Sequence, residues 1–351
     1  MSHATPAAVS ADETPDARAF RRLLAPYKLP SRRRALIQLG NSALPFAALW
    51  AAMAWSTGVS YWLTALLAVP AAGLFLRLFM IQHDCGHGSF FRSARANNWL
   101  GGVLRVVTFF PYGYWRRTHS IHHATHGNLD RREFGDIKTL TVREYQALGR
   151  LGRLGYRLYR NPFVLFGLGP IYQFVLKHRF PFDLPFAWKR EWASVLWTNL
   201  GIVAAGGALS WLLGWRTVAV VHGSIMLVAG ALGVWLFYVQ HQFEESYWDD
   251  GDEWDFYRAG ADGSSFYDLP RVLHWFTANI GYHHIHHLAS RIPNYRLREC
   301  FEENPELQRV TRLTIRESLG CARLRLWDEE RRRMIGFREL GSAAERERAA
   351  A

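Results

Sequence analysis

The chain has 351 residues, enough for one large domain or two ordinary ones, and its formal net charge is +12. It is 49% hydrophobic, with 15 Trp and 22 Phe, and its apolar residues are segregated into long uncharged runs. Soluble domains rarely need such runs, so the composition indicates a membrane protein. No nucleic-acid-binding module accompanies the positive charge, and we therefore expect lipid rather than nucleic acid to face it.

The first uncharged run, Ala35–Leu76, is too long for one membrane span. A helix of this length would measure about 63 Å at about 1.5 Å per residue, twice the hydrocarbon thickness of about 30 Å. The run therefore predicts a helical hairpin with spans at about 36–56 and 60–82. The basic segment before it, residues 1–34, is expected to be a cytoplasmic tail rather than a typical signal peptide.

A second pair of uncharged runs, Trp192–Trp215 and Thr217–Gln240, is separated only by Arg216. It predicts a second hairpin with spans at about 193–214 and 217–240. Residues Asn161–Leu176 are also apolar, but they are short and contain two prolines. An interfacial or re-entrant segment is the favoured interpretation there.

Basic residues are concentrated in the N-terminal tail, the loop between the hairpins and the C-terminal part, whereas the two hairpin tips offer only Arg216. The positive-inside rule then places both termini and the middle loop in the cytoplasm of a multi-pass membrane protein. The three cysteines would face a reducing compartment, so no disulfide framework is expected.

Three histidine clusters, "HDCGH", "HSIHH" and "HHIHH", and one single histidine stand out. With two hairpins in the chain, the direction of each span brings all of them to the same membrane face, although they are far apart in sequence. The residues concerned are His83 and His87; His119, His122 and His123; His241, directly after the fourth span; and His283, His286 and His287.

The spacing within each cluster favours a metal centre. Positions three and four apart share one face of a helix, so we expect each cluster to point its imidazoles into one place. Neutral imidazole is a common ligand of iron, zinc and copper, but a zinc site closes with four ligands. Nine such histidines therefore favour two metal ions with open positions. A set of hydrogen-bonded interfacial histidines is the alternative, and three converging clusters make it the weaker one.

The three boxes, in this order around two hydrophobic hairpins, resemble the membrane fatty acid desaturase family over roughly residues 35–300. The stretch Asn279–Leu297, "NIGYHHIHHLASRIPNYRL", resembles bacterial acyl-lipid desaturases of the omega-6, or delta-12, type, which implies a location in a bacterial inner membrane. The resemblance implies an all-α integral membrane fold whose helical cytoplasmic cap holds a histidine-rich diiron site. It also implies two iron ions, dioxygen as co-substrate and a cis double bond introduced into an acyl chain. All nine histidines would be iron ligands, with His241 matching the ligand that family members place after the fourth span.

Five further residues are candidates for orienting the ligand rings through hydrogen bonds: Asp84, His126, Asp130, Asp136 and His284. His126 could equally be a polar interfacial residue. His222 lies 19 residues before His241, about 28 Å away along a helix, and is expected to lie outside the centre.

Residues 301–335 are expected to form a helical cytoplasmic part, including an amphipathic helix over 310–335, and residues 336–351 a flexible tail. The chain carries no dinucleotide fingerprint and no haem motif, so electrons would come from a separate carrier such as a ferredoxin or a cytochrome. The acyl chain could be carried on a lipid, on coenzyme A or on a carrier protein.

Two other functions are compatible with parts of this pattern. A related diiron membrane oxidase, such as an acyl hydroxylase or acetylenase, a carotenoid ketolase or an alkane hydroxylase, would share the metal centre. The other alternative is a protein without catalytic activity, either a transporter or a metal-binding membrane protein. Transporters place polar groups near the middle of the membrane, whereas these histidines lie at one edge of it.

Overall fold

The computed structural model of the protein describes residues 15–132 and 135–340. Four helices of the described chain are long and apolar enough to cross a membrane: α2 (Arg32–Ser56), α3 (Tyr61–His87), α9 (Lys189–Leu213) and α10 (Trp215–His241). Each would measure about 37–40 Å at about 1.5 Å per residue, more than the hydrocarbon core of about 30 Å. The protein is therefore an integral membrane protein, and the expected mostly helical membrane fold is confirmed.

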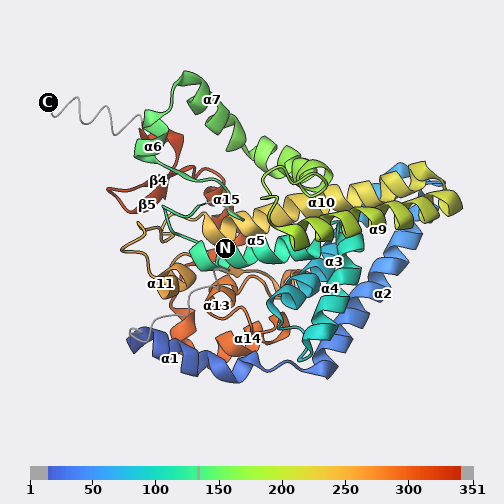
Figure 1. Cartoon of the computed structure of the whole chain (residues 1–351), viewed down its shortest axis with the longest axis horizontal. Helices are drawn as coiled ribbons and strands as arrows, with labels where there is room; N and C mark the ends of the chain where they lie inside the picture. The colour runs from blue at the N-terminus through green and yellow to red at the C-terminus, as the bar shows by residue number, and fades with distance from the viewer. Residues whose placement is uncertain (1–14, 133–134, 341–351) are drawn as a thin grey trace.

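The four long helices form two hairpins that pack on each other through α3 and α10. In the first hairpin, the hydroxyl groups of Ser56 and Thr64 lie 2.7 Å apart and close the turn. In the second, Gly214 joins the helices with a φ of 83°. Figure 1 shows the long helices reaching to one side, with α1, α11, α13, α14 and the strands β4 and β5 gathered at the other end.

Helices α4 (Ala94–Thr108) and α5 (Tyr112–Thr125) follow the first hairpin. Ser93 caps α4 by accepting a hydrogen bond from the backbone N–H of Ala96 at 3.2 Å. Helix α5 packs against α3 and α9, which holds the second histidine cluster beside the end of α3.

The apolar stretch between the hairpins does not form a fifth span among the described residues. It is built of short turns, η2 (Phe163–Leu168), α8 (Gly169–Ile171) and η3 (Tyr172–Lys177), and η2 and α8 pack on α10. η2 and η3 are π-helical. Pro162 and Pro170 lack the N–H groups that a regular helix needs, and this interrupts the helix. Helices α6 (Val142–Ala147) and α7 (Arg150–Tyr159) precede this stretch.

Arg160, which is fully buried, links the middle loop to the end of α10. Its guanidinium donates to the Gln242 Oε1 at 2.7 Å, to the Leu324 carbonyl at 3.2 Å and to the Lys138 carbonyl at 3.2 Å. Gln242 directly follows His241, so this arginine also braces the backbone beside a predicted ligand.

The prediction of an amphipathic helix over residues 310–335 is wrong. The chain forms β3 (Arg312–Thr314), α15 (Ile315–Cys321), β4 (Leu326–Asp328) and β5 (Arg333–Ile335) there. Strand β4 pairs in parallel with β1 (Leu140–Thr141) and antiparallel with β5, and β3 pairs in parallel with β2 (Phe266–Asp268). β3 and β4 gain hydrogen bonds from β2 and β1, which are distant in sequence, and β5 pairs with its neighbour β4; helical periodicity cannot reveal such pairing.

The expected tail is also partly ordered, because Phe337 packs on Tyr145 and Arg157. Residues 341–351 of that tail, and residues 1–14 of the N-terminal one, lie outside the described residues. The remaining elements are α1 (Pro15–Leu24), η1 (Ala25–Lys28), α11 (Phe256–Ala261), α12 (Arg271–Phe276), α13 (His283–Leu288), α14 (Asn294–Glu303) and η4 (Pro305–Gln308).

Candidate metal centre

The first histidine cluster occupies the last turn of α3. The helix runs beyond the predicted span to His87 and ends there because Gly88 adopts a φ of 68°, a left-handed conformation that favours glycine. Gly86 between the two histidines allows a close approach, since a Cβ there would lie 2.7 Å from the Trp115 ring. That indole in turn stacks on the ring of His119, with centroids 4.5 Å apart. The small residue in "HDCGH" thus brings α5 against α3.

All nine predicted ligands converge at the ends of α3 and α10, and they separate into two groups. Within each group, the nitrogen atoms that could bind a metal all lie within 4.8 Å of one another. One group contains His83, His87, His119, His123 and His286, and the other contains His122, His241, His283 and His287.

The second and third clusters each contribute to both groups, contrary to the expectation that each cluster points into one place. On α5, His119 and His123 face the first group, while His122 faces the second. Residues four apart are offset by about 40° around a helix, but adjacent residues are offset by about 100°. A H-x-x-H-H box on a helix therefore supplies ligands to two neighbouring sites.

The chemistry of these side chains fits metal ions. The Nε2 atoms of His87, His122, His286 and His287 are buried and have no hydrogen-bond partner among the described residues. An unpartnered buried polar atom costs about 1–3 kcal/mol, which a bound cation would offset. Elsewhere two ring nitrogens face each other, as for His241 and His283, whose Nε2 atoms lie 2.9 Å apart.

Outside the membrane-spanning helices, burial and the neighbouring histidines hold the pKa values of the ligand candidates well below their usual range. This applies to His119, His123, His283, His286 and His287. The rings are therefore neutral at physiological pH, which is the form that binds a metal.

Carboxylates and a carbonyl hold the opposite edges of several rings. The Nδ1 of His83 donates to Asp84 at 3.1 Å, and Asp84 accepts two hydrogen bonds from Asn294, from the backbone N–H at 2.7 Å and from the side-chain amide at 2.8 Å. The Nδ1 of His122 donates to Asp136 at 2.6 Å. A proton held at Nδ1 leaves Nε2 of each ring free to bind a metal.

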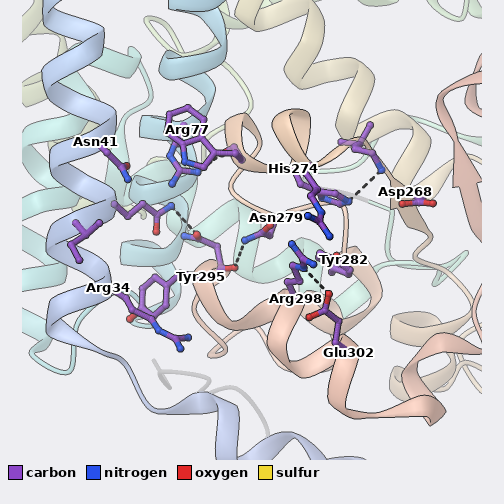
Figure 2. Close-up of a pocket in the computed structure, with 16 residues that line it drawn as sticks. Arg34, Asn41, Arg77, Asp268, His274, Asn279, Tyr282, Tyr295, Arg298 and Glu302 are labelled. Carbon is purple, nitrogen blue, oxygen red and sulfur yellow. Dashed lines mark hydrogen bonds and ion pairs between the residues drawn. The ribbon is translucent and has the colours of Figure 1, made fainter.

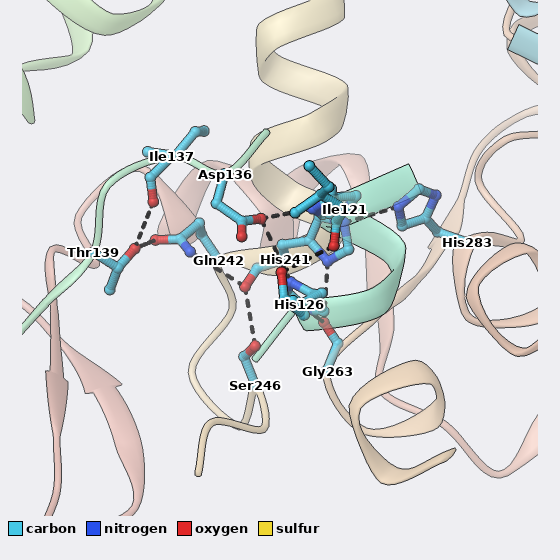
Figure 3. A network of polar contacts seen from close by, with 12 residues as sticks. Ile121, His126, Asp136, Ile137, Thr139, His241, Gln242, Ser246, Gly263 and His283 are labelled. Atoms are coloured by element: carbon cyan, nitrogen blue, oxygen red, sulfur yellow. Dashed lines mark hydrogen bonds and ion pairs between the residues drawn. The ribbon is translucent and has the colours of Figure 1, made fainter. Parts of the chain in front are cut away.

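The Asp136 carboxylate belongs to a smaller network around the second group (Figure 3). Burial would raise the pKa of Asp136, but His122 and His126 beside it hold this pKa well below its usual range. His126 lies 3.8 Å from the same carboxylate oxygen and donates from Nε2 to the Gly263 carbonyl at 2.8 Å. That carbonyl also accepts from the Nδ1 of His241 at 3.2 Å.

Two of the five candidates for orienting ligand rings lie elsewhere. Asp130 is exposed and accepts a hydrogen bond from the backbone N–H of Gly251 at 2.9 Å, so it does not reach either histidine group. His284 packs its ring against Phe266 and Phe301 and belongs to neither group. His222, which was expected to lie outside the centre, does so and stacks near Phe109.

Sequence reasoning did not identify Asn294 or Gly263 as parts of the site. Asn294 lies within "RIPNYRL", but no spacing relates it to Asp84, from which it is 210 positions away. Gly263 acts through its carbonyl, which every residue type possesses. Only the folded chain reveals these two partners.

The hydrogen bond from His122 to Asp136 generates a prediction about metal affinity. Replacing Asp136 by Ala frees the His122 ring to rotate, and we expect metal affinity to fall about 10–100-fold. The matched control, Asp130→Ala, should retain wild-type affinity because the Asp130 carboxylate accepts a hydrogen bond from the backbone of Gly251 and reaches neither histidine group. Elemental analysis after dialysis against graded chelator measures both variants, and equal metal retention by the two would contradict the assignment.

Comparison with known proteins identifies the family. The sequence matches the fatty acid desaturase family over residues 60–318. It is 47% identical over 317 residues to a fatty acid desaturase of Bacillus subtilis, covering 90% of each chain. It is 31% identical over 239 residues to an sn-1 acyl-lipid omega-3 desaturase (ferredoxin) of Synechocystis, covering 65% of this chain and 64% of that one. An endoplasmic reticulum omega-3 fatty acid desaturase of Vigna radiata is 30% identical over 248 residues, 66% of this chain and 62% of the relative. With histidine groups suited to metal at one end of the bundle of four apolar helices, the chain belongs to the fatty acid desaturase family and is an oxidoreductase that acts on fatty acyl lipids.

Proposed function

We propose that this desaturase holds two iron ions in the two histidine groups and introduces a cis double bond into the acyl chain of a membrane lipid. The observation that carries the proposal is the pair of adjacent groups, five and four histidines, with unpartnered nitrogen atoms converging in each. The nine ligands are His83, His87, His119, His123 and His286 in one group, and His122, His241, His283 and His287 in the other.

The reaction demands such a centre because an unactivated methylene group offers neither an acidic proton nor a leaving group. Two bound iron ions with dioxygen supply an oxidant strong enough to remove hydrogen from such carbons. The chain's own residues keep the imidazoles neutral, orient them and exclude water. Asp84 and Asp136 hold protons at the Nδ1 atoms of His83 and His122, which directs the Nε2 atoms inward.

The two groups differ in their access to the surroundings. All four residues of the second group are buried, whereas His87, His119 and His123 of the first group are only partly buried. Dioxygen and the acyl chain would therefore approach the first group more easily, and the second group would be the drier of the two.

Metal analysis and two alanine variants test the centre. Purified protein should contain about two iron ions per chain, because nine nitrogen ligands exceed what one closed site can use. His286→Ala should abolish double-bond formation, while the matched variant His222→Ala, within α10, should retain it. Stoichiometric zinc without iron-dependent activity, or similar activity in both variants, would show that the centre is assigned wrongly.

The position of the new double bond is proposed to be delta-12, which rests on the resemblance of Asn279–Leu297 to omega-6 desaturases. The names of the Synechocystis and Vigna relatives favour omega-3 as the second candidate. Electrons would come from an external carrier, and the ferredoxin in the name of the Synechocystis relative makes a ferredoxin our choice over a cytochrome.

Expression in a host that lacks polyunsaturated fatty acids decides the position. We expect a new diene with its second double bond at delta-12, identified by gas chromatography and mass spectrometry of derivatised fatty acids. An omega-3 product formed only after feeding of a diene would favour the second candidate. A hydroxylated or acetylenic product would instead replace the desaturase proposal with a related diiron oxidase.

We further propose that the histidine groups and both termini lie in the cytoplasm, because Arg216 is the only basic residue at the two hairpin tips. The native cysteines Cys85, Cys300 and Cys321 are buried, so a cysteine introduced on the surface can be labelled selectively. A membrane-impermeant maleimide should label Arg216→Cys in intact cells and Arg150→Cys only after permeabilisation. The reverse pattern would invert the orientation.

A further inference from the structure

A cavity of 540 Å³ lies outside the two histidine groups, between the start of α2, the middle of α3, and α12 and α14. Its volume is in the range of small-molecule sites. Four arginines and two carboxylates line it, which leaves two positive charges on its wall. These residues are Arg34, Arg77, Arg271, Arg298, Asp268 and Glu302.

Arg77 is the unusual member of this lining, because it is a cation within a membrane-spanning helix and only 7% exposed. Its guanidinium donates to the Ser42 hydroxyl at 3.0 Å and to the Trp275 carbonyl, and it lies 4.2 Å from the centre of the Trp275 ring. All these partners are neutral, and no carboxylate of the described chain forms an ion pair with it. A buried cation without a counter-ion beside a cavity favours an anionic ligand.

The carboxylates of the cavity do not compensate Arg77. Figure 2 shows Asp268 and Glu302 on the side of the cavity away from Asn41 and Arg34, which come from α2. Each carboxylate already has its own arginine: Glu302 accepts from Arg298 at 2.7 Å, and Asp268 pairs with Arg312. Arg34, at the end of the cavity near α2, is likewise paired with Glu299. Arg77 therefore remains as the buried cation of the wall without a carboxylate partner among the described residues, alongside the amide groups of Gln38 and Asn41.

The cavity lies within reach of the lipid head groups. Arg77 is 16 residues from the start of α3 at Tyr61, about 24 Å along a helix, so its Cα lies about 6 Å inside the edge of a hydrocarbon layer of about 30 Å, a depth from which an arginine side chain reaches the interface. Ile37, which lines the cavity, is 55% exposed on α2, and Val272 on α12 is 63% exposed. Apolar side chains exposed beside a charged cavity allow a lipid to enter laterally from the bilayer.

The cavity wall is also connected to the first histidine group. Gln38 donates to Asn294 at 2.8 Å, Asn294 donates to Asp84, and Asp84 accepts from His83. Tyr282, another residue of the wall, directly precedes His283 of the second group. A molecule in the cavity would therefore sit against the same segments that position the predicted ligands.

We propose that this cavity binds the phosphate group of a glycerophospholipid, with Arg77 as its main electrostatic partner. The ligand chemistry is a phosphate, and the exposed apolar side chains of Ile37 and Val272 beside the cavity favour a phospholipid over free phosphate or coenzyme A. The assignment rests on the proposed function in one respect, since it names the carrier of the acyl chain that the enzyme would oxidise.

Lipid binding tests the proposal without relying on catalysis. Full-length, metal-loaded protein in detergent is titrated with phosphatidylglycerol, and bound lipid is counted by native mass spectrometry. We expect at least about tenfold tighter binding than for a diacylglycerol with the same acyl chains, about 1.4 kcal/mol. Arg77→Met should lose that preference, while Arg216→Met, at the opposite ends of the long helices, should keep it.

The metal content of Arg77→Met reports whether this variant folds. If it does not fold, a second variant still tests the proposal. Asn41→Phe fills the end of the cavity near α2 and leaves the contacts of Arg77 intact, and it should also weaken phosphatidylglycerol binding about tenfold. Unchanged binding in Asn41→Phe, or equal binding of diacylglycerol by the wild type, would overturn the proposal.

Competition separates the sources of phosphate. Millimolar inorganic phosphate or coenzyme A should leave phosphatidylglycerol bound, and displacement by either would overturn the choice of a phospholipid.

The same measurements separate this proposal from the proposed function. If phosphatidylglycerol binding depends on Arg77 but the protein has no desaturase activity, the lipid site stands and the proposed function is refuted. If the protein is an active desaturase but lipid binding is unchanged by both substitutions, the proposed function stands and the lipid site is refuted.

Discussion

The packing of nine imidazoles, six buried and three partly buried, at one edge of the helical bundle is the constraint on which the rest of the structure depends. Neutral histidine rings with unpartnered nitrogens are unstable in a dry interior unless something binds them. The fold therefore has to bring four separate segments to one place and to keep their rings fixed. It does so by ending α3 at His87 and α10 at His241 on the same side of the bundle, and by laying α5 and α13 across them.

The rigidity of this arrangement comes from polar partners behind the rings. Asn294 holds Asp84, which holds His83, while Asp136 holds His122 and the Gly263 carbonyl serves His126 and His241. Further out, Arg160 ties the backbone next to His241 to the middle loop and to the C-terminal segment. The C-terminal segment is thereby linked to the backbone beside the centre, although it contributes no histidine to it.

The same framework positions the arginine-lined cavity. Segment 279–298 supplies the third histidine cluster on one side and Asn279, Tyr295 and Arg298 of the cavity wall on the other. A phospholipid bound there and a metal centre would share one structural element, so head-group recognition and the positioning of the acyl chain need not be independent.

Much of this protein follows from the sequence by itself. The four long helices, the co-location of the histidine clusters and the exclusion of His222 depend on hydrophobic length and helical rise, which are local properties of the chain. Three features were decided only by the tertiary structure. Strands β3 and β4 pair with distant segments, Asp130 turns toward Gly251 instead of a histidine, and each H-x-x-H-H box divides between two groups. Periodicity predicts which side chains share a face of one helix. The partners of those side chains depend on how separate helices pack, and no single segment of the sequence encodes that packing.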